Sequence, residues 1–442
     1  MSVCLITFLG TSNYEEVIYS FNNAKEIKTP YIQEALIKNH LDLFKENDAL
    51  LNVFMTDKAR EKNWTTEQGL FNRIGKLIDK NCIKATSINE ISEEDNLWVL
   101  FEQVFKAIPE NCKVILDITH GFRTLPLFGL VLLNYARTLK KIKVLAIYYG
   151  AFEAKNNGKA PVIDLLRLDS LLRWGNAIET FIRHGNADGI DLLTKESVRE
   201  ELQKGYTETG AREERDLAKY LKQSVESLLT VRGNIIIEGK PFLQVKEKLF
   251  VIEQKSIYVK PLEPLHKLVK DSFELFLENS PSNILAAMDL CIKYGYIQQG
   301  ITLMQEGIIT LLLHIDGKDK LENRNYRIAV SELLQHLAEP EKYKEPCKDI
   351  EMHSFASSLA NNQICKDLQK PYNRLRDLRN DINHAGFSST PIKQGRFNNA
   401  LLDAFKELLE CLENNKKTIN DIRIKNTVRK LLQKYCSNKE TD

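Results

Sequence analysis

Short apolar runs rich in β-forming residues recur through the first 165 residues and alternate with segments of helical periodicity. The runs occupy residues 4–8, 49–54, 98–99, 113–117 and 143–149. Strands that alternate with helices build α/β folds with a mostly parallel sheet, because each helix returns the chain to the same end of the sheet. We therefore expect residues 1–165 to form an α/β domain.

Two loops that follow predicted strands have the composition of an anion pocket. One holds Gly10, Thr11, Ser12 and Asn13, and the other holds Thr119, His120, Gly121, Arg123 and Thr124. Ligands of parallel sheets gather at the carboxyl ends of the strands, where backbone N–H groups point outward. Arg123 adds a fixed positive charge to the second loop. For Thr11 and Ser12, helix capping is the alternative explanation. Neither loop has the glycine spacing of a P-loop or a dinucleotide-binding turn.

The remaining chain is mostly helical in its periodicity. Residues 166–184 predict a helix, and 195–229 are charged and helix-prone. Alternating apolar residues across 233–259, around Gly239 and Pro241, predict a hairpin, so we interpret 166–260 as a connector. The amphipathic segments 282–313 and 397–412 predict an all-α helical bundle over 261–442.

Arg379 and His384 form an Arg-x4-His motif near the end of a predicted helix. A guanidinium stabilises the charge of a phosphate in the transition state, and an imidazole moves protons near neutral pH. Together these two side chains suit RNA cleavage by the neighbouring 2′-hydroxyl. Asn380 and Asn383 add polar groups to the motif. A surface arginine and a core histidine are the structural alternative.

The spacing of the motif also constrains its geometry. Five residues place Arg379 and His384 about 140° apart on an ideal helix. The pair therefore cannot lie on one helical face, and a site shared across a dimer interface would solve this. Glu306, on the helix predicted before Leu313, is a candidate to orient Arg379, with an exposed carboxylate as the alternative.

The net charge and the cysteine pattern limit which partners and cofactors the protein is expected to bind. The net charge of +2 gives no overall attraction to nucleic acid, so any such contact must be local. The eight cysteines show neither Cys-x-x-Cys spacing nor a nearby histidine at ligand spacing, so we expect free thiols and no metal site. The N-terminus lacks a basic region and a cleavage site, and no apolar segment suits a bilayer, which predicts a cytoplasmic protein without membrane contact. The basic C-terminal tail either grips RNA phosphates or is a solvated helix face.

Both ends of the chain resemble the CRISPR-associated CARF–HEPN ribonucleases of type III interference systems. The N-terminal resemblance rests on the turn at residues 9–12, the loop at 117–123 and the strand end at 148–153. The C-terminal resemblance rests on Arg379, Asn380 and His384, which match the HEPN nuclease pattern.

The resemblance implies a Rossmann-like CARF domain at 1–165 and a HEPN nuclease domain at 261–442. It implies a homodimer whose CARF pocket binds cyclic oligoadenylate, a ring of four or six adenylates, through the two loops described above. Binding would activate cleavage of single-stranded RNA by Arg379 and His384, assisted by Asn380 and Asn383. The products would carry a 2′,3′-cyclic phosphate and a 5′-hydroxyl, and no metal or other cofactor would be required.

Three alternatives remain. The protein could be a nucleotide-sensing regulator without catalysis. The CARF pocket could itself cleave its cyclic ligand, since Thr11, Ser12, Thr119 and His120 could position a 2′-hydroxyl. The helical domain could also be a toxin-like nuclease that needs no activator.

Overall fold

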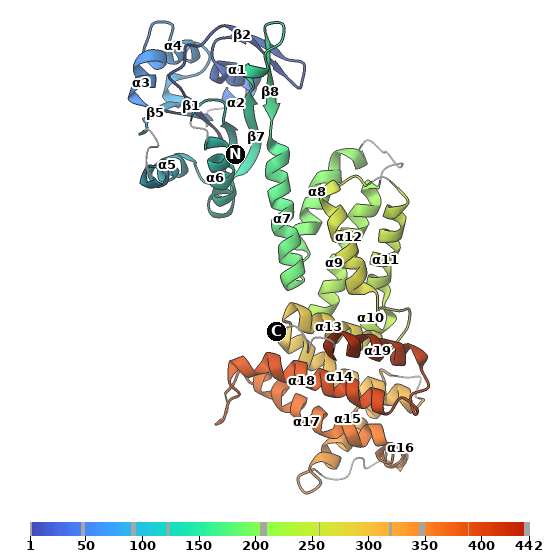
Figure 1. Cartoon of the computed structure of the whole chain (residues 1–442). Helices are drawn as coiled ribbons and strands as arrows, with labels where there is room; N and C mark the ends of the chain where they lie inside the picture. Colours follow the sequence, from blue (N-terminus) through green and yellow to red (C-terminus); the bar gives the residue numbers. More distant parts are fainter. Residues whose placement is uncertain are drawn as a thin grey trace. The chain divides into compact units, whose positions relative to one another are not determined.

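The computed structural model describes residues 2–45, 49–89, 94–121, 124–203, 210–255, 257–317, 321–343, 350–387 and 389–436. The chain divides into two units, Met1–Leu172 and Arg173–Asp442 (Figure 1).

Parallel strands form the centre of the sheet in the first unit. They are β1 (Val3–Leu9), β4 (Ala49–Met55), β5 (Ile83–Ser87), β6 (Lys113–Asp117) and β7 (Lys143–Gly150). β1 lies between β4 and β6, and Val3 pairs with Ala49 on one side and with Lys113 on the other. Every residue of β1 is buried, as an unbroken apolar run in a parallel sheet predicts. The expected α/β fold with a mostly parallel sheet is confirmed.

Three further strands make the sheet mixed. They are β2 (Val17–Phe21), β3 (Glu26–Thr29) and β8 (Lys159–Asp164). Within the described residues the strand order is β3-β2-β8-β7-β6-β1-β4-β5. β8 is antiparallel to β7, β2 is parallel to β8, and β3 is antiparallel to β2. These three strands, like β5, were not among the runs expected from the sequence.

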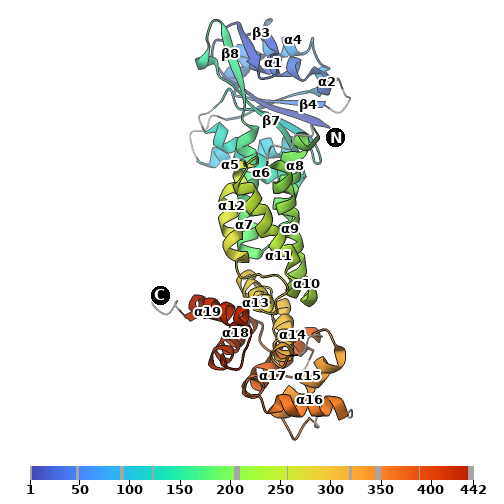
Figure 2. The same cartoon turned by 90° about the vertical axis from the view of Figure 1, so that its right-hand side faces the viewer.

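Helices cover both faces of the sheet, and each face has its own hydrophobic core. Figure 2 shows α1 and α4 on the side of the sheet opposite α5 and α6. One layer contains α1 (Ile32–Asn39), α2 (Leu41–Phe44), α3 (Asp57–Ala59), η1 (Arg60–Trp64) and α4 (Leu70–Ile74). The other layer contains α5 (Glu94–Ala107) and α6 (Leu125–Lys140). Two short turns of 3₁₀ helix complete the unit, η2 (Lys80–Cys82) and η3 (Phe152–Ala154).

The strand expected at 98–99 is wrong, because both residues lie within α5. Leu100, Val104 and Ile108 follow one another at intervals of four and are all buried. That period places them on one side of a helix, facing the sheet. Two β-prone residues do not override this longer pattern, and Trp98 points to solvent with 63% of its surface exposed.

The second unit consists of helices in its described residues. Its first part contains α7 (Leu166–His184, which begins in the first unit), α8 (Asp188–Gln203), α9 (Ala211–Leu229), α10 (Gly233–Glu238), α11 (Lys240–Glu253), η4 (Lys260–Leu262) and α12 (Glu263–Phe273). The helix predicted at 166–184 is confirmed. The hairpin predicted at 233–259 is wrong, since α10 and α11 occupy most of that segment.

The physical reason for the helices is the spacing of the buried residues in α11. Phe242, Val245, Leu249 and Ile252 are buried at intervals of three and four, which is helical periodicity. Gly239 has φ +76° and ends α10, and a proline then opens α11. Glycine and proline here mark a break between two helices, as their preferences for helix ends allow.

The rest of the second unit packs around α14. Its elements are α13 (Asn283–Tyr294), α14 (Ile297–Ile315), α15 (Arg324–Ala338), α16 (Ile350–Ala360), α17 (Gln363–Asn383), η5 (Gln394–Arg396), α18 (Phe397–Asn414) and α19 (Ile422–Cys436). The predicted segment 282–313 is two helices, divided at Gly295 with φ +72°. The helix predicted at 397–412 is confirmed. No helix in the described part of the chain is long and apolar enough to cross a membrane.

Candidate functional site

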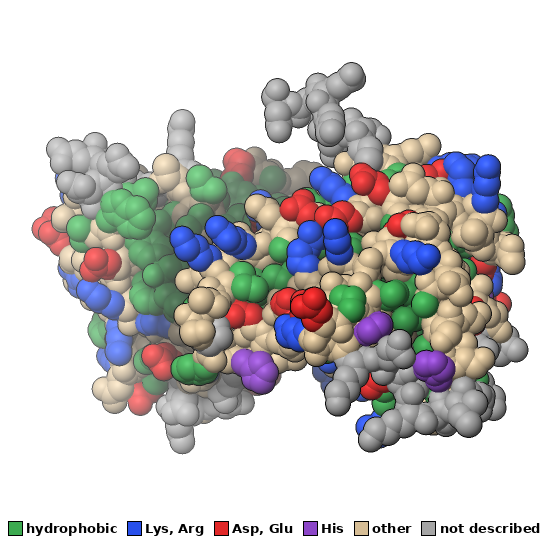
Figure 3. Space-filling model, turned by 90° about the horizontal axis from the view of Figure 1, so that it is seen from below, with side chains coloured by type: hydrophobic (Ala, Val, Ile, Leu, Met, Phe, Trp, Pro, Cys, Tyr) green, Lys and Arg blue, Asp and Glu red, His purple; other side chains and the backbone are tan. Residues whose placement is uncertain are grey.

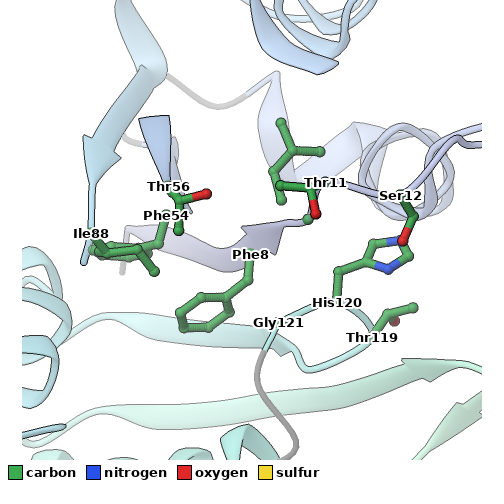
Figure 4. Close-up of a pocket in the computed structure, with 11 residues that line it drawn as sticks. Phe8, Thr11, Ser12, Phe54, Thr56, Ile88, Thr119, His120 and Gly121 are labelled. Atoms are coloured by element: carbon green, nitrogen blue, oxygen red, sulfur yellow. The ribbon is translucent and has the colours of Figure 1, made fainter. Parts of the chain in front are cut away.

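A cavity of about 310 Å³ opens at the carboxyl edge of the sheet, beside the ends of β1, β4 and β6. Figure 4 shows Thr11 and Ser12 on one loop and Thr119, His120 and Gly121 on another. This is the edge at which parallel α/β sheets bind their ligands. The lining residues are Phe8, Leu9, Gly10, Thr11, Ser12, Phe54, Thr56, Ile88, Thr119, His120 and Gly121.

Hydrogen bonds clamp the loop at Gly10–Ser12 in place. The buried Asn63 side chain donates from Nδ2 to the carbonyl oxygens of Gly10 (2.9 Å) and Ser12 (3.0 Å). The Gly10 N–H donates to the Tyr14 hydroxyl at 2.9 Å. The Tyr14 ring packs against the ring of His120 with centroids 4.7 Å apart, which links the two loops. The hydroxyl side chains of the first loop stay exposed above this clamp.

Asp117, at the end of β6, holds the second loop in place through hydrogen bonds. It is fully buried and accepts hydrogen bonds from Thr7 Oγ1 (2.6 Å) and from the Thr119 N–H (3.0 Å). Thr119 Oγ1 in turn accepts a bond from the Gly150 N–H at 2.8 Å. Burial raises the pKa of Asp117, and the bonds from Thr119 and Thr7 oppose that rise. Three neighbouring strands therefore position this loop.

His120 carries a buried polar atom that the protein does not satisfy. Its Nε2 has no hydrogen-bond partner among the described residues. Burial lowers the pKa of His120, and the nearby Asp117 opposes this. A buried polar atom without a partner is unusual in a native structure. His120 thus lines the cavity and carries a buried ring nitrogen without a partner among the described residues.

The structure brings together six of the nine residues predicted for this pocket: Gly10, Thr11, Ser12, Thr119, His120 and Gly121. Asn13 is exposed and does not line the cavity, and Thr124 directly precedes α6 outside it. Arg123 lies outside the described residues.

Sequence reasoning missed Phe8, Phe54, Thr56 and Ile88. Thr56 lies two residues after the run predicted at 49–54, so its position offered a signal, but Ile88 follows β5, which was not predicted.

Arg379, on α17, points toward α14. Its Nη1 donates to Gln305 Oε1 at 2.8 Å and to Glu306 Oε1 at 3.2 Å. Its Nε and Nη2 make no hydrogen bond with the described residues. These two nitrogens remain available to grip a phosphate. Arg379 lines a cavity of about 610 Å³ between α14, α15 and α17.

Glu306 is held by a second arginine. Arg327 Nη2 donates to Glu306 Oε2 at 2.8 Å, and also to the Glu306 carbonyl at 3.1 Å. Arg327 Nη1 bonds Thr310 Oγ1 at 3.0 Å and the Leu321 carbonyl at 2.9 Å. Arg327 therefore fixes the carboxylate that contacts Arg379. The contact suggested by the sequence between Glu306 and Arg379 is present, whereas nothing in the sequence indicated Arg327.

His384 lies at the C-terminal end of α17, on a different face from Arg379. The helix ends through left-handed residues at Ala385 (φ 53°) and Gly386 (φ 69°), and the Gly386 N–H bonds the Asp381 carbonyl at 2.8 Å. His384 lines a separate cavity of about 390 Å³ together with Asp377, Asn380, Asp381, Gly386, Phe387, Thr390 and Ile392.

Within one chain, then, Arg379 and His384 line different cavities, as their helical spacing predicts. Asn380 shares the cavity of His384, but Asn383 is exposed and lines neither. The sequence pattern did not indicate the acidic side chains of Asp377 and Asp381, which line this cavity beside His384. Among the described residues, no three His, Cys, Asp or Glu side chains gather as a possible metal site.

The basic C-terminal tail forms ion pairs. On α19, Lys430 contacts Glu274 at 2.6 Å, and Lys434 contacts Asp289 at 2.5 Å. On the face of the second unit shown in Figure 3, basic and acidic side chains are interspersed. This agrees with the near-neutral net charge and favours a solvated face for these lysines. Lys439 lies outside the described residues.

The chain is similar to known proteins in its N-terminal part. Residues 4–153 match the family described as "CRISPR system endoribonuclease Csx1, CARF domain". The chain is also 28% identical to the CRISPR-associated protein MJ1674 of Methanocaldococcus jannaschii, over 39% of this chain. The match spans 29% of that relative. Residues 4–153, with their α/β fold, are therefore similar to the CARF domain of the CRISPR-associated Csx1 family, and a helix-rich unit follows them.

Proposed function

We propose that this protein is a single-stranded RNA endoribonuclease that cyclic oligoadenylate activates in type III CRISPR defence. The observation that carries the proposal is the combination of two features in one chain. A polar cavity lies at the carboxyl edge of a sheet similar to the Csx1 CARF domain. A helical unit carries Arg379 and the exposed His384 at the end of α17.

The cavity suits a phosphate-containing ring. Exposed hydroxyls of Thr11 and Ser12 and the backbone of Gly121 donate to phosphate oxygens, while the unused His120 Nε2 pairs with a polar group of the ligand. In this proposal two copies of the chain form a homodimer and face their cavities together. A twofold site then matches the symmetry of a cyclic ligand.

Cleavage proceeds by attack of a ribose 2′-hydroxyl on the neighbouring phosphate. Arg379 grips the phosphate through its free Nε and Nη2 and stabilises the charge of the transition state, while Gln305 and Glu306 hold its Nη1. His384 transfers the proton. The 5′-oxygen leaves, and the products carry a 2′,3′-cyclic phosphate and a 5′-hydroxyl. Because Arg379 and His384 line different cavities of one chain, the active site in this proposal combines side chains of both copies.

Activation follows from differential binding. A ligand shifts an equilibrium only when it binds one arrangement more tightly than the other. The ring therefore favours the dimer arrangement in which the two α17 helices approach productively.

The test is cleavage of a fluorophore-quencher single-stranded RNA in EDTA, with and without cyclic tetra- or hexa-adenylate. Wild type is compared with His384→Ala and with His184→Ala, an exposed histidine of the same unit that serves as the matched control. We expect cleavage that requires a ring and His384 but not His184. Cleavage without any ring would indicate a ligand-independent nuclease. No cleavage under any condition would refute the nuclease and favour a regulator.

A second activity is suggested by the unpartnered His120 Nε2 in a pocket that the hydroxyl side chains of Thr11, Ser12 and Thr119 also line. Such a group could help a 2′-hydroxyl of the ring attack its own phosphate, so that the pocket slowly destroys its activator. Chromatography of the ligand after long incubation measures this. Intact ligand with wild type, or equal degradation by His120→Ala, would exclude it.

A further inference from the structure

Phe387 stands out among the large hydrophobic side chains of the described residues, because 92% of its surface is exposed. Single exposed apolar residues are common on protein surfaces and need no explanation by themselves. This one, however, lines the same cavity as His384. It makes no ring or cation contact with the described residues, so both faces of the ring are open.

The turn after α17 fixes the backbone of Phe387 beside His384. The Phe387 N–H donates to the His384 carbonyl at 3.0 Å, and the Ala385 N–H donates to Ile382 at 3.0 Å. Gly386 between them has a left-handed φ that glycine adopts without strain. A further bond at 3.3 Å runs from the Ile392 N–H to Asp381 Oδ1, and Ile392 lines the cavity as well. The aromatic ring is therefore presented at a defined place next to the histidine.

The charge of the cavity indicates which part of an RNA it receives. Its walls include the carboxylates of Asp377 and Asp381 and the amide of Asn380, with no lysine or arginine among the described lining residues. Arg376, outside the cavity lining, pairs with Asp377 Oδ1 at 3.1 Å. Carboxylate and amide oxygens accept hydrogen bonds from the amino groups of a base. Arg379, whose guanidinium suits a phosphate, lines a different cavity. The His384 cavity is thus suited to a nucleobase.

We propose that Phe387 is a stacking platform for the base of a nucleotide next to the cleaved phosphate. The inference rests on the proposed function, because it assigns the RNA substrate to the same site. Stacking on an aromatic side chain is tolerant of base identity, since every base has a π face. Phe387 would therefore strengthen RNA binding with little sequence preference.

The test uses the full chain and a short fluorescent RNA in which every ribose is 2′-O-methylated, so that it binds but cannot be cut. Affinity is measured by fluorescence anisotropy for wild type, Phe387→Ala and Phe387→Tyr. Phe250→Ala is the matched control, because Phe250 is a 64% exposed phenylalanine on α11 of the same unit. We expect Phe387→Ala to weaken binding about 5- to 150-fold, the range that corresponds to about 1–3 kcal/mol per stacked base. Phe387→Tyr and Phe250→Ala should bind as wild type does.

A second arm replaces single bases of the RNA by abasic sites. If Phe387 stacks on one base, wild type loses affinity at one position and Phe387→Ala loses nothing more there. Unchanged binding by Phe387→Ala overturns the proposal, as does a loss that Phe387→Tyr fails to restore. A change of molecular mass in light scattering would instead show that the ring covers a second copy of the chain. Wild type that binds this RNA through Phe387 but cuts no natural RNA would refute the proposed nuclease and leave the stacking intact.

Discussion

Replacing Asn63 by alanine should destabilise the loop at Gly10–Ser12, which lines the proposed ligand pocket. Asn63 is 6% exposed and touches the pocket only through its two bonds to the carbonyls of Gly10 and Ser12, at 2.9 and 3.0 Å. No pocket-lining side chain is altered by the substitution. The variant therefore separates the placement of the loop from the chemistry of its hydroxyl groups.

The size of the effect follows from those two bonds. A hydrogen bond between neutral groups contributes about 0.5–1.5 kcal/mol, so the loss of both should lower the free energy of unfolding by about 1–3 kcal/mol. Asn72→Ala is the matched control in the same unit. Asn72 also donates to two loop carbonyls, those of Thr66 and Glu67, at 3.1 and 3.4 Å. Asn72 is half-buried and its two bonds lie at the solvent-exposed surface, where water replaces them, so its loss should cost less than about 0.5 kcal/mol.

The assay is urea unfolding followed by tryptophan fluorescence, since Trp64 directly follows Asn63 and is buried. The affinity for cyclic tetra- or hexa-adenylate is measured in parallel. We expect Asn63→Ala to lose both stability and affinity relative to Asn72→Ala. Equal stability of the two variants would refute the clamp. Lower stability with unchanged affinity would show that binding of the cyclic ligand does not depend on the placement of this loop.

Three further predictions follow from named contacts. Glu306→Ala should slow RNA cleavage by about tenfold, less than the 10²- to 10³-fold typical of losing a transition-state donor, because Arg379 remains but loses its orientation; a rate equal to wild type would contradict this. Burial raises the pKa of Glu214 to about 7, so the native state keeps a proton that the unfolded chain has already lost. Stability should therefore fall by up to about 3 kcal/mol as the pH rises from about 4.5 to about 7. Urea unfolding of Glu214→Gln should lack this fall, whereas Glu213→Gln should retain it. Gly121→Ala should destabilise the first unit by about 1–3 kcal/mol, because φ is +128° and the new Cβ would lie 3.0 Å from a Leu125 methyl carbon; an unchanged urea midpoint would argue against strain at this turn.

Local patterns were sufficient for much of the fold. The apolar runs at β1, β4, β6 and β7 predicted strands, and helical spacing predicted α7 at its observed ends. The same reasoning failed across 233–259, where alternation around a glycine and a proline suggested a hairpin. There the burial of residues at intervals of three and four decided in favour of helices.

The candidate sites show the same division. Loop composition alone indicated six residues of the pocket, since polar residues after parallel strands meet at one edge of the sheet. Loop composition could not identify the residues that hold those loops in place, because these contacts are distant in the sequence. Asn63 and Gly10 are 53 positions apart, and Thr7 and Asp117 are 110 positions apart. On α17 the spacing of Arg379 and His384 already required different helical faces.

The sequence by itself determined which residue types stand at the ends of the strands and on each face of α17, because these depend on periods of two and 3.6 residues. Only the tertiary structure decided that Arg327 fixes Glu306, that Glu306 contacts Arg379, and that Phe387 stands exposed beside His384. Such contacts join elements whose approach depends on the packing of the whole core. The period of a single helix carries no information about its neighbour.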